Sequence, residues 1–236
     1  MTATTPLAAR LAEVQRRIEA ACARVGRRPE EVTLVAVSKT HPADTVFEGA
    51  TAGVRAFGEN RAQEFVPKVL AFRDGAREQG LSGVEWHFIG HLQRNKVRDV
   101  LPYVDVLHSL DSERLVREIA ARAPEARPGH HRLRCFIEVN IAGEAQKEGV
   151  QPSEVALLLE AARAAEVLDV RGLMTVAPRT TDPEAARPVF AALRALAAEH
   201  ALPELSMGMT DDFEVAIEEG ATVVRVGRAL FGDRLG

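Results

Sequence analysis

The stretch VTLVAVSKT, residues 32–40, has the pattern of a short buried strand that ends on a lysine. Its run of aliphatic and β-branched residues without polar alternation is typical of a strand covered on both faces. A charged amine beside a buried core is costly unless it is paired or neutral. Lys39 therefore either extends into water or supplies a reactive amine at the strand end. The rest of the chain helps to decide between these two alternatives.

Seven more strand-like runs follow residues 32–38, with helix-like segments between them. They lie at residues 54–57, 86–89, 106–110, 133–141, 170–176, 205–207 and 223–226. Strands that alternate with helices are typical of parallel βαβ units. About eight such units in 236 residues predict a single (β/α)8 TIM barrel, whereas an open doubly wound sheet is the alternative. We predict one domain over residues 1–236, with an N-terminal helix at about 8–25 and the barrel at about 31–232.

The composition limits the partners and the cellular compartment that we expect for this protein. The net charge is -4 and no block of basic residues occurs, so nucleic acid is not an expected partner. The two cysteines are too few and too far apart for a disulfide framework or a metal site, which fits a reducing compartment. We find no signal-peptide pattern and no apolar run long enough to cross a bilayer, and we expect a cytoplasmic protein without a membrane partner.

Polar side chains follow most of the predicted strands, and in a barrel the carboxyl ends of all strands meet at one mouth. The residues at or near these ends are Lys39, Asn60, His91, His108, Glu138, Met174, Ser206 and Arg225. Polar residues at strand ends can simply meet solvent. Together they would bring an amine, an amide, imidazoles, a hydroxyl and a guanidinium to one opening. His87 and His91 have an H-x3-H spacing, but they span a strand and a turn, so we expect no zinc site.

Two glycine-containing stretches near the end of the chain suggest a phosphate site. SMGMTDD, residues 206–212, precedes a predicted helix, and VRVGR, residues 224–228, contains Gly227 before Arg228. Backbone N–H groups at a helix start or in a glycine turn bind phosphate well, and barrels often place such a site after strands seven and eight. The alternative is that Gly208 and Gly227 are only turn glycines.

The presence of a lysine rather than an arginine at position 39 indicates a reactive amine. Only four lysines occur among the 30 basic residues of the chain. Arginine does not lose its proton under ordinary conditions, whereas the pKa of a desolvated lysine can fall well below about 10.4. A neutral amine can attack an aldehyde and form a Schiff base. An amine with a phosphate site suggests a phosphorylated carbonyl compound, either pyridoxal 5′-phosphate (PLP) or a sugar phosphate.

Six stretches resemble the pyridoxal phosphate homeostasis proteins. They are VAVSKT (35–40), FGENRAQE (57–64), WHFIGHLQRNK (86–96), GLMTVAP (172–178), SMGMTDDFEVAIEEG (206–220) and VRVGRALFG (224–232). As an ordered set they are specific, although each is weak alone. The resemblance implies a barrel like the N-terminal domain of alanine racemase, with PLP held as a Schiff base.

The resemblance also implies the residues of the site. Lys39 matches the Schiff-base lysine, Asn60 a residue near the cofactor, Ser206 a phosphate ligand and Arg225 the arginine facing the pyridine nitrogen. The full predicted cofactor-binding set is Lys39, Asn60, Met174, Ser206, Met207, Gly208, Arg225, Gly227 and Arg228. At position 228 the family often has a small or hydroxyl residue, so here only the backbone N–H is expected to be a ligand. His91 stands where many relatives have proline.

The implied function is a PLP carrier or buffer in cofactor homeostasis, without efficient turnover of amino acids. A cationic Arg225 would disfavour protonation of the ring nitrogen and weaken the ring as an electron sink. Alanine racemase adds a tyrosine from a second domain, whereas the one tyrosine here, Tyr103, is predicted at the far end of a helix. The alternatives are a racemase-like PLP enzyme and a cofactor-free aldolase. We expect a monomer, with PLP-dependent apoenzymes as possible recipients.

Overall fold

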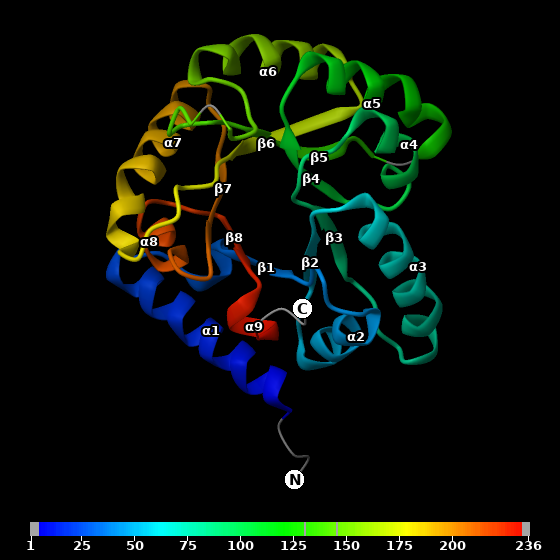
Figure 1. Cartoon of the computed structure of the whole chain (residues 1–236), viewed down its shortest axis with the longest axis vertical. Helices are drawn as coiled ribbons and strands as arrows, with labels where there is room; N and C mark the ends of the chain where they lie inside the picture. Colours follow the sequence, from blue (N-terminus) through cyan, green and yellow to red (C-terminus); the bar gives the residue numbers. More distant parts are fainter. Residues whose placement is uncertain (1–4, 130, 145, 233–236) are drawn as a thin grey trace.

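The computed structural model describes residues 5–129, 131–144 and 146–232, and it contains a closed barrel of eight parallel strands (Figure 1). The strands are β1 (Thr33–Val37), β2 (Ala56–Glu59), β3 (Glu85–Phe88), β4 (Val106–Leu110), β5 (Leu133–Glu138), β6 (Leu168–Met174), β7 (Glu204–Met209) and β8 (Val223–Val226). Each strand pairs with the next along the chain, and β8 pairs with β1 to close the barrel. The predicted barrel is confirmed, and the open doubly wound sheet is wrong.

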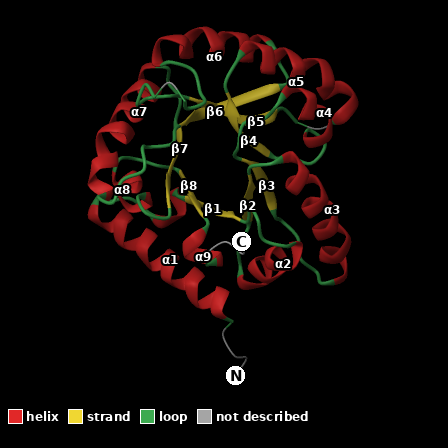
Figure 2. Ribbon diagram, viewed as in Figure 1, coloured by secondary structure: helices red, strands yellow, loops and turns green. Residues whose placement is uncertain are grey.

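Helices surround the strands as an outer ring (Figure 2). They are α1 (Pro6–Arg24), α2 (Ala43–Ala52), α3 (Ala62–Glu78), α4 (Val97–Val100), α5 (Glu113–Ala126), α6 (Val155–Ala164), α7 (Arg187–Glu199), α8 (Phe213–Glu218) and α9 (Arg228–Phe231). This arrangement buries both faces of every strand, which explains why the strand sequences are continuous apolar runs rather than alternating ones. In the part of the chain that the structure describes, no helix is long and apolar enough to cross a bilayer.

Helix α1 precedes the barrel in the chain, and it packs against α8 and α9, the helices near the C-terminal end of the chain (Figure 1). Its start is capped by the Thr5 hydroxyl, which accepts a hydrogen bond from the N–H of Ala8 at 3.2 Å. Leu11, Val14 and Ile18 recur at helical spacing and are buried. This helix therefore seals the barrel wall next to the strands that carry the predicted site.

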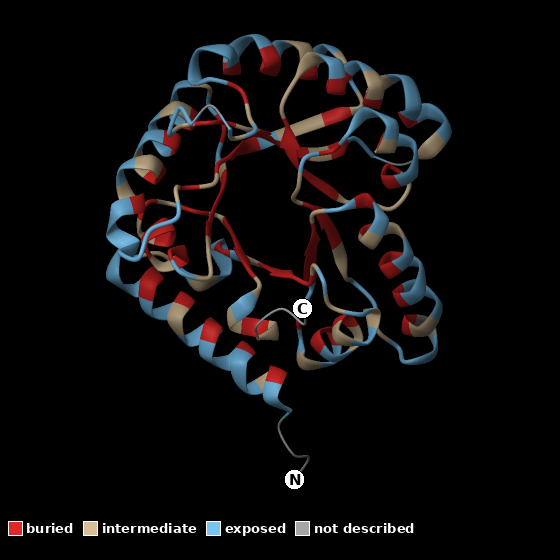
Figure 3. Ribbon diagram, in the orientation of Figure 1, coloured by how far each residue is buried: buried red, intermediate tan, exposed pale blue. Residues whose placement is uncertain are grey.

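The core has two layers. The larger one lies between the strands and the helices, and the strands are buried along most of their length (Figure 3). A smaller apolar cluster of Val35, Ala56, Val106, Phe136, Met174 and Val223 occupies the barrel interior. Polar side chains of β3, β4, β7 and β8 are buried as well. The interior therefore holds a mixed layer of apolar and polar groups rather than a purely hydrophobic one.

One strand boundary differs from the sequence predictions, and two helices continue past residues that can end a helix. Helix α3 continues to Glu78 because its apolar face, including Ala76, stays buried. Helix α5 passes Pro124, since a proline in the last turn removes one backbone hydrogen bond but leaves Ala123 packed. Strand β5 ends at Glu138, and Val139 continues only as an isolated bridge to Val150.

Gly172 on β6 pairs with Glu204 on β7 at a position with no room for a Cβ, and it gives a test of the barrel wall. A Cβ atom at this position would lie 1.8 Å from the backbone oxygen of Glu204 on β7. We expect Gly172→Ala to lower the free energy of unfolding by about 2 kcal/mol or more, because backbone atoms cannot yield as a side chain can. Urea unfolding followed by circular dichroism measures this loss.

Gly49→Ala is the matched control for that substitution. Its Cβ would meet the ring of Phe57 at 3.0 Å, a side chain that can shift, and alanine favours the helix that contains this position. We expect a change of at most about 1 kcal/mol. Equal losses for the two variants would contradict the assignment of a backbone clash to Gly172.

Candidate functional site

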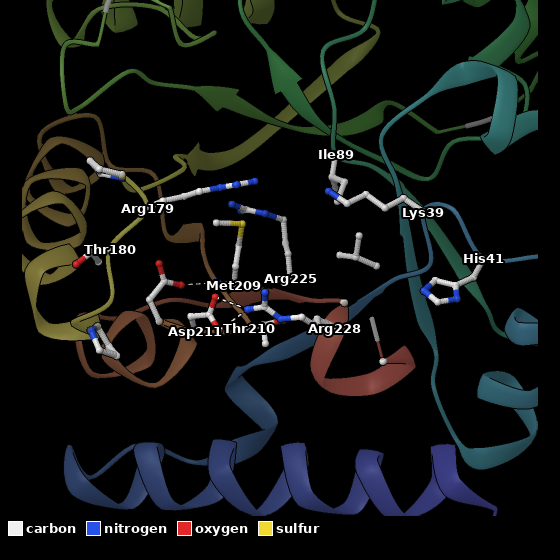
Figure 4. A pocket seen from close by; sticks show the side chains of 16 residues that line it. Lys39, His41, Ile89, Arg179, Thr180, Met209, Thr210, Asp211, Arg225 and Arg228 are labelled. Carbon is white, nitrogen blue, oxygen red and sulfur yellow. Dashed lines mark hydrogen bonds and ion pairs between the residues drawn. The ribbon is translucent and has the colours of Figure 1, made fainter. Parts of the chain in front are cut away.

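A cavity of about 610 Å³ opens at the carboxyl ends of the strands, beside β1, β7 and β8. Four residues of the predicted set line it: Lys39, Arg225, Gly227 and Arg228. Figure 4 shows the Lys39 side chain extending into this cavity from one side, with Arg225 facing it from the strand wall. The structure therefore brings an amine and a guanidinium together at the mouth, from strands at the two ends of the barrel sequence.

Lys39 is positioned by a buried polar network beneath it. The Ser38 hydroxyl donates to Glu59 Oε1 at 2.7 Å, and Lys68 Nζ donates to the Ser38 backbone oxygen at 2.9 Å and pairs with Glu59. Thr40 then adopts a left-handed φ of 68°, and its N–H donates to Glu64 at 2.8 Å. These contacts fix the backbone on both sides of Lys39, so the strand end presents its amine in a defined direction.

Lys68 itself lies in surroundings that the sequence did not indicate. It is 6% exposed and forms an ion pair with the fully buried Glu59, although its sequence neighbourhood looks amphipathic. Burial raises the pKa of Glu59, while the nearby Lys68 ammonium opposes that rise. Lys68 is thus a structural counterion under β1, and its amine is already engaged below the cavity floor.

Arg225 is a buried cation, 4% exposed, whose contacts hold the guanidinium in one orientation. Its Nη1 donates to Ser206 Oγ at 2.6 Å and its Nη2 to the Thr175 backbone oxygen at 2.9 Å. Burial lowers the pKa of Arg225 to about 10, against the opposing effect of the Glu138 and Asp212 carboxyl groups. The side chain therefore still carries its charge at neutral pH.

A chain of hydrogen bonds continues from Arg225 through the barrel interior. Ser206 Oγ lies 2.8 Å from His108 Nδ1, and His108 Nε2 lies 2.8 Å from His87 Nδ1. Burial, followed by His87 and Arg225, lowers the pKa of His108 well below its ordinary value, so this imidazole is neutral. Because Arg225 can only donate, Ser206 accepts from it and donates its own proton towards His108. The network thus stabilises the guanidinium without adding a second positive charge beside it.

Of the residues predicted to hold a phosphate, Gly227 and Arg228 line the cavity, whereas Ser206 and Gly208 do not. Ser206 is fully buried and does not line the cavity, because its hydroxyl bonds Arg225 and His108 below it. Thr210, four residues later, lines the cavity together with Gly227 and Arg228. The Arg228 side chain pairs with both oxygens of Asp211 at 2.6 Å, so it does not simply extend into solvent.

The other members of the predicted set lie away from the cavity lining. Met174 and Met207 are buried in the barrel wall and core, and Gly208 has a φ of 90° with no room for a Cβ against Ala216, 2.5 Å away. Asn60 lines a separate hollow of about 600 Å³ beyond β2. The sequence reasoning missed Thr210, His41 and Arg179 in the cavity; only Thr210, inside SMGMTDD, had a signal that could have identified it.

The donor set suits a phosphorylated aldehyde with an aromatic nitrogen. Lys39 offers an amine, Arg225 a fixed guanidinium, and Thr210 a hydroxyl beside the start of α9. The first N–H groups of a helix have no partners within that helix and can donate to an anion. A Cβ at Gly227 would lie 3.2 Å from the Val37 backbone oxygen, so the glycine keeps this turn close against β1.

Comparison with known proteins identifies relatives along nearly the whole chain. A model of the alanine racemase N-terminal domain matches residues 10–235. The pyridoxal phosphate homeostasis protein of Aquifex aeolicus is 44% identical over 231 residues, covering 95% of this chain and 97% of that protein. The protein of the same name from Escherichia coli K12 is 42% identical over 233 residues, covering 97% of each.

Solved structures agree with these sequence matches. PipY of Synechococcus elongatus, solved with PLP bound, superposes with a TM-score of 0.80 at 33% identity, covering 96% of this chain and all of that one (100%). An unknown protein from Bifidobacterium adolescentis has a TM-score of 0.87 at 35% identity, covering 95% of this chain and 94% of that one. Alanine racemase from Corynebacterium glutamicum shares the fold, with a TM-score of 0.62 at 18% identity, covering 96% of this chain and 62% of that one.

Glu138, at the end of β5, makes the stability of the protein depend on pH. Burial raises its pKa to about 7, against the effect of Arg225 and with Asp111 and Glu148 adding to the rise. Between its ordinary pKa and about 7 the folded protein holds a proton that the unfolded chain releases. The free energy of unfolding therefore falls as pH rises through this window, and the loss is complete above it.

We expect Glu138→Gln to remove this loss, since the amide stays neutral at every pH. Relative to the parent protein, the free energy of unfolding of the variant should be higher by roughly 1–2 kcal/mol at pH 8 and nearly unchanged at pH 4.5. This gain is smaller than the full pKa shift would give, because water screens a partly exposed group. Urea unfolding at the two pH values measures the difference. Glu160→Gln, on the exposed side of α6, is the control, and an equal gain there would contradict the assignment.

Proposed function

The chain belongs to the pyridoxal phosphate homeostasis proteins and carries the alanine racemase N-terminal domain, and on that premise we propose that it binds PLP in the cavity at the barrel mouth. Its function is to hold and release the cofactor in the PLP homeostasis of the cell. The observation that carries this proposal is the pairing of Lys39 and Arg225 across one cavity, with Thr210 and Gly227 beside them.

Each group of the cofactor has a candidate partner among these residues. When bound, PLP supplies an aldehyde that an amine can attack and a ring that can withdraw electrons. Lys39 would hold the aldehyde end and Arg225 the ring nitrogen. We assign the phosphate to the Thr210 hydroxyl and to backbone N–H groups at Gly227 and Arg228, in place of the Ser206 hydroxyl, which Arg225 and His108 already engage.

The charge of Arg225 supports a carrier rather than an efficient enzyme. A guanidinium whose pKa burial lowers only to about 10 remains cationic at neutral pH, and a cation beside the ring nitrogen disfavours its protonation. An unprotonated ring withdraws electrons less strongly. Tyr103, the one tyrosine of the sequence, does not line the cavity. The Arg73 guanidinium lies over its ring, 5.3 Å from the ring centroid. The site thus favours holding PLP over turning over amino acids.

The remaining parts of the proposal concern partners and location. We propose that PLP-dependent apoenzymes are the recipients and that the protein acts as a monomer in the cytoplasm. Its two cysteines are buried thiols, which suits a reducing compartment. A racemase-like activity is the competing function, since alanine racemases share the fold. Incubation of the PLP-loaded protein with amino acids, followed by chiral analysis, distinguishes the two.

Lys39→Ala should abolish covalent attachment of PLP. We expect the parent protein to absorb at long wavelength after incubation with PLP. Borohydride should fix one cofactor per chain on the Lys39 peptide, because Lys39 alone among the described residues that line the cavity has an amine side chain. Peptide mass spectrometry locates the modified residue. Lys96→Ala, which removes an amine outside this cavity, is the control and should keep the adduct. An adduct on Lys96 or Lys147 in the parent protein would refute the assignment.

Thr210→Ala and Ser206→Ala separate the two phosphate assignments. The loss of one hydrogen bond to an anionic phosphate at Thr210 should weaken PLP binding by about 5- to 30-fold, that is about 1–2 kcal/mol. Ser206→Ala should instead lower the melting temperature, because Arg225 Nη1 loses its buried acceptor. Fluorescence titration with PLP and thermal unfolding measure the two effects. A larger loss of PLP affinity in Ser206→Ala than in Thr210→Ala would restore Ser206 as the phosphate ligand.

A further inference from the structure

Three side chains outside the cavity meet on the other side of the barrel mouth. His91, Asp111 and Glu148 follow the neighbouring strands β3, β4 and β5 (Figure 1). His91 Nδ1 lies 2.8 Å from Asp111 Oδ2 and 3.6 Å from Glu148 Oε2, and one ligand atom from each residue lies within 4.8 Å of the other two. None of the three lines the cavity that holds Lys39 and Arg225.

We propose that His91, Asp111 and Glu148 form a binding site for a divalent transition-metal ion of the Zn²⁺ class. One imidazole nitrogen with two carboxylate oxygens is a ligand set that Zn²⁺ accepts, and three protein ligands leave a coordination position for water. Ligand atoms about 2.1 Å from a tetrahedral ion lie about 3.4 Å apart. The two distances from His91 Nδ1, 2.8 and 3.6 Å, bracket that separation, so small side-chain movements admit an ion.

The backbone on which each ligand sits is already fixed. Gly90, just before His91, accepts a hydrogen bond from the Ser109 hydroxyl at 2.5 Å, and a Cβ on it would collide with the backbone of Asn60. The Ser112 hydroxyl donates to Asp111 Oδ1 at 3.0 Å, which leaves Oδ2 directed at His91. The site therefore needs little ordering when an ion binds.

Glu148 comes from a polar loop, and this loop is also tied to the barrel. Lys147 Nζ donates to the backbone oxygen of Val176, just after the end of β6, at 3.2 Å. Val150 donates to the Glu138 oxygen at 2.9 Å and accepts from Asn140 at 2.9 Å. The backbone of Glu148 thus lies between two anchored residues, and its carboxylate, on a side chain that is 60% exposed, lies 3.6 Å from His91 Nδ1.

The local charge favours a cation. In the described ranges, with residues 130 and 145 outside them, the ion pairs recorded for Asp111 and Glu148 both go to the same His91 imidazole. Two carboxylates therefore share one group that carries at most one positive charge. A divalent ion would replace the imidazole proton and balance both carboxylates. The alternative is that His91 and Asp111 form only a surface ion pair. In that case the cluster would not bind a metal ion.

Isothermal titration of the full chain with zinc chloride, after removal of metals with a chelator, tests the proposal. We expect one zinc per chain and a higher melting temperature at saturation. Cobalt chloride gives a second readout, because Co²⁺ bound by protein ligands acquires visible absorption bands that report its coordination. Both cysteines are buried, so a thiol site elsewhere does not compete in the described residues.

Three variants decide between the site and a simple ion pair. His91→Ala and Glu148→Gln should each weaken zinc binding by at least about tenfold and remove the cobalt bands. His131→Ala, which removes an exposed imidazole elsewhere, is the matched control and should bind zinc as the parent does. Absence of zinc binding by the parent chain would overturn the proposal. Unchanged binding by His91→Ala, with intact circular dichroism, would overturn it too. PLP is not needed in any of these measurements, so their outcome is independent of the cofactor assignment.

Discussion

The burial of the Arg225 guanidinium inside the barrel is the constraint on which the site depends. A charged group removed from water is tolerated only where its hydrogen bonds and its charge are compensated. Arg225 meets this condition with the Ser206 hydroxyl, the Thr175 backbone oxygen and the nearby Glu138 and Asp212 carboxyl groups. The polar interior of the barrel follows from that requirement. The neighbouring imidazole of His108 stays neutral mainly because it is buried, and His87 and Arg225 further disfavour a positive charge there by lowering its pKa.

Closure of the barrel places the buried Arg225 guanidinium beside the same cavity as Lys39. Strand β8 pairs with β1, so Arg225 and Lys39 share one cavity although they lie near opposite ends of the sequence. Under β1, the Lys68–Glu59 pair and the Ser38 hydroxyl hold the strand end from which Lys39 extends. Both basic groups are therefore presented by rigid strands, and a cofactor that binds both gains from their pre-organisation.

The mouth of the barrel divides into two chemically different halves. On the side of β1, β7 and β8, Lys39, Arg225 and the Thr210 hydroxyl line the cavity together with the Asp211 and Asp212 carboxylates, and Asp211 pairs with the Arg228 side chain. On the side of β3, β4 and β5 two carboxylates and an imidazole meet, which suits a metal cation. Glu138 lies at the end of β5 within electrostatic reach of both Arg225 and the acidic cluster.

The sequence by itself determined the barrel, the lysine that ends its first strand, and the arginine and glycine that end its last. Eight apolar runs alternating with helical spacing are local patterns, and parallel packing of such units leaves few other arrangements. Lys39 and Gly227 stood out for the same local reason, as residues unusual for their place. Pattern alone did not show whether a residue near a strand end faces the cavity or the interior. Thr210 lines the cavity, whereas Ser206, which the family resemblance suggested as a phosphate ligand, bonds Arg225 inside the barrel.

Only the tertiary structure decided which distant side chains meet. The pairing of Lys68 with Glu59, the His87–His108–Ser206 chain, and the meeting of His91, Asp111 and Glu148 all join residues on different helices, strands or loops. His91 and Asp111 are 20 positions apart in the sequence, a separation that carries no periodic signal. Contacts of this kind depend on the register between strands and on the course of each loop. Both are set when the barrel closes, because closure fixes every strand end against its two neighbours at once.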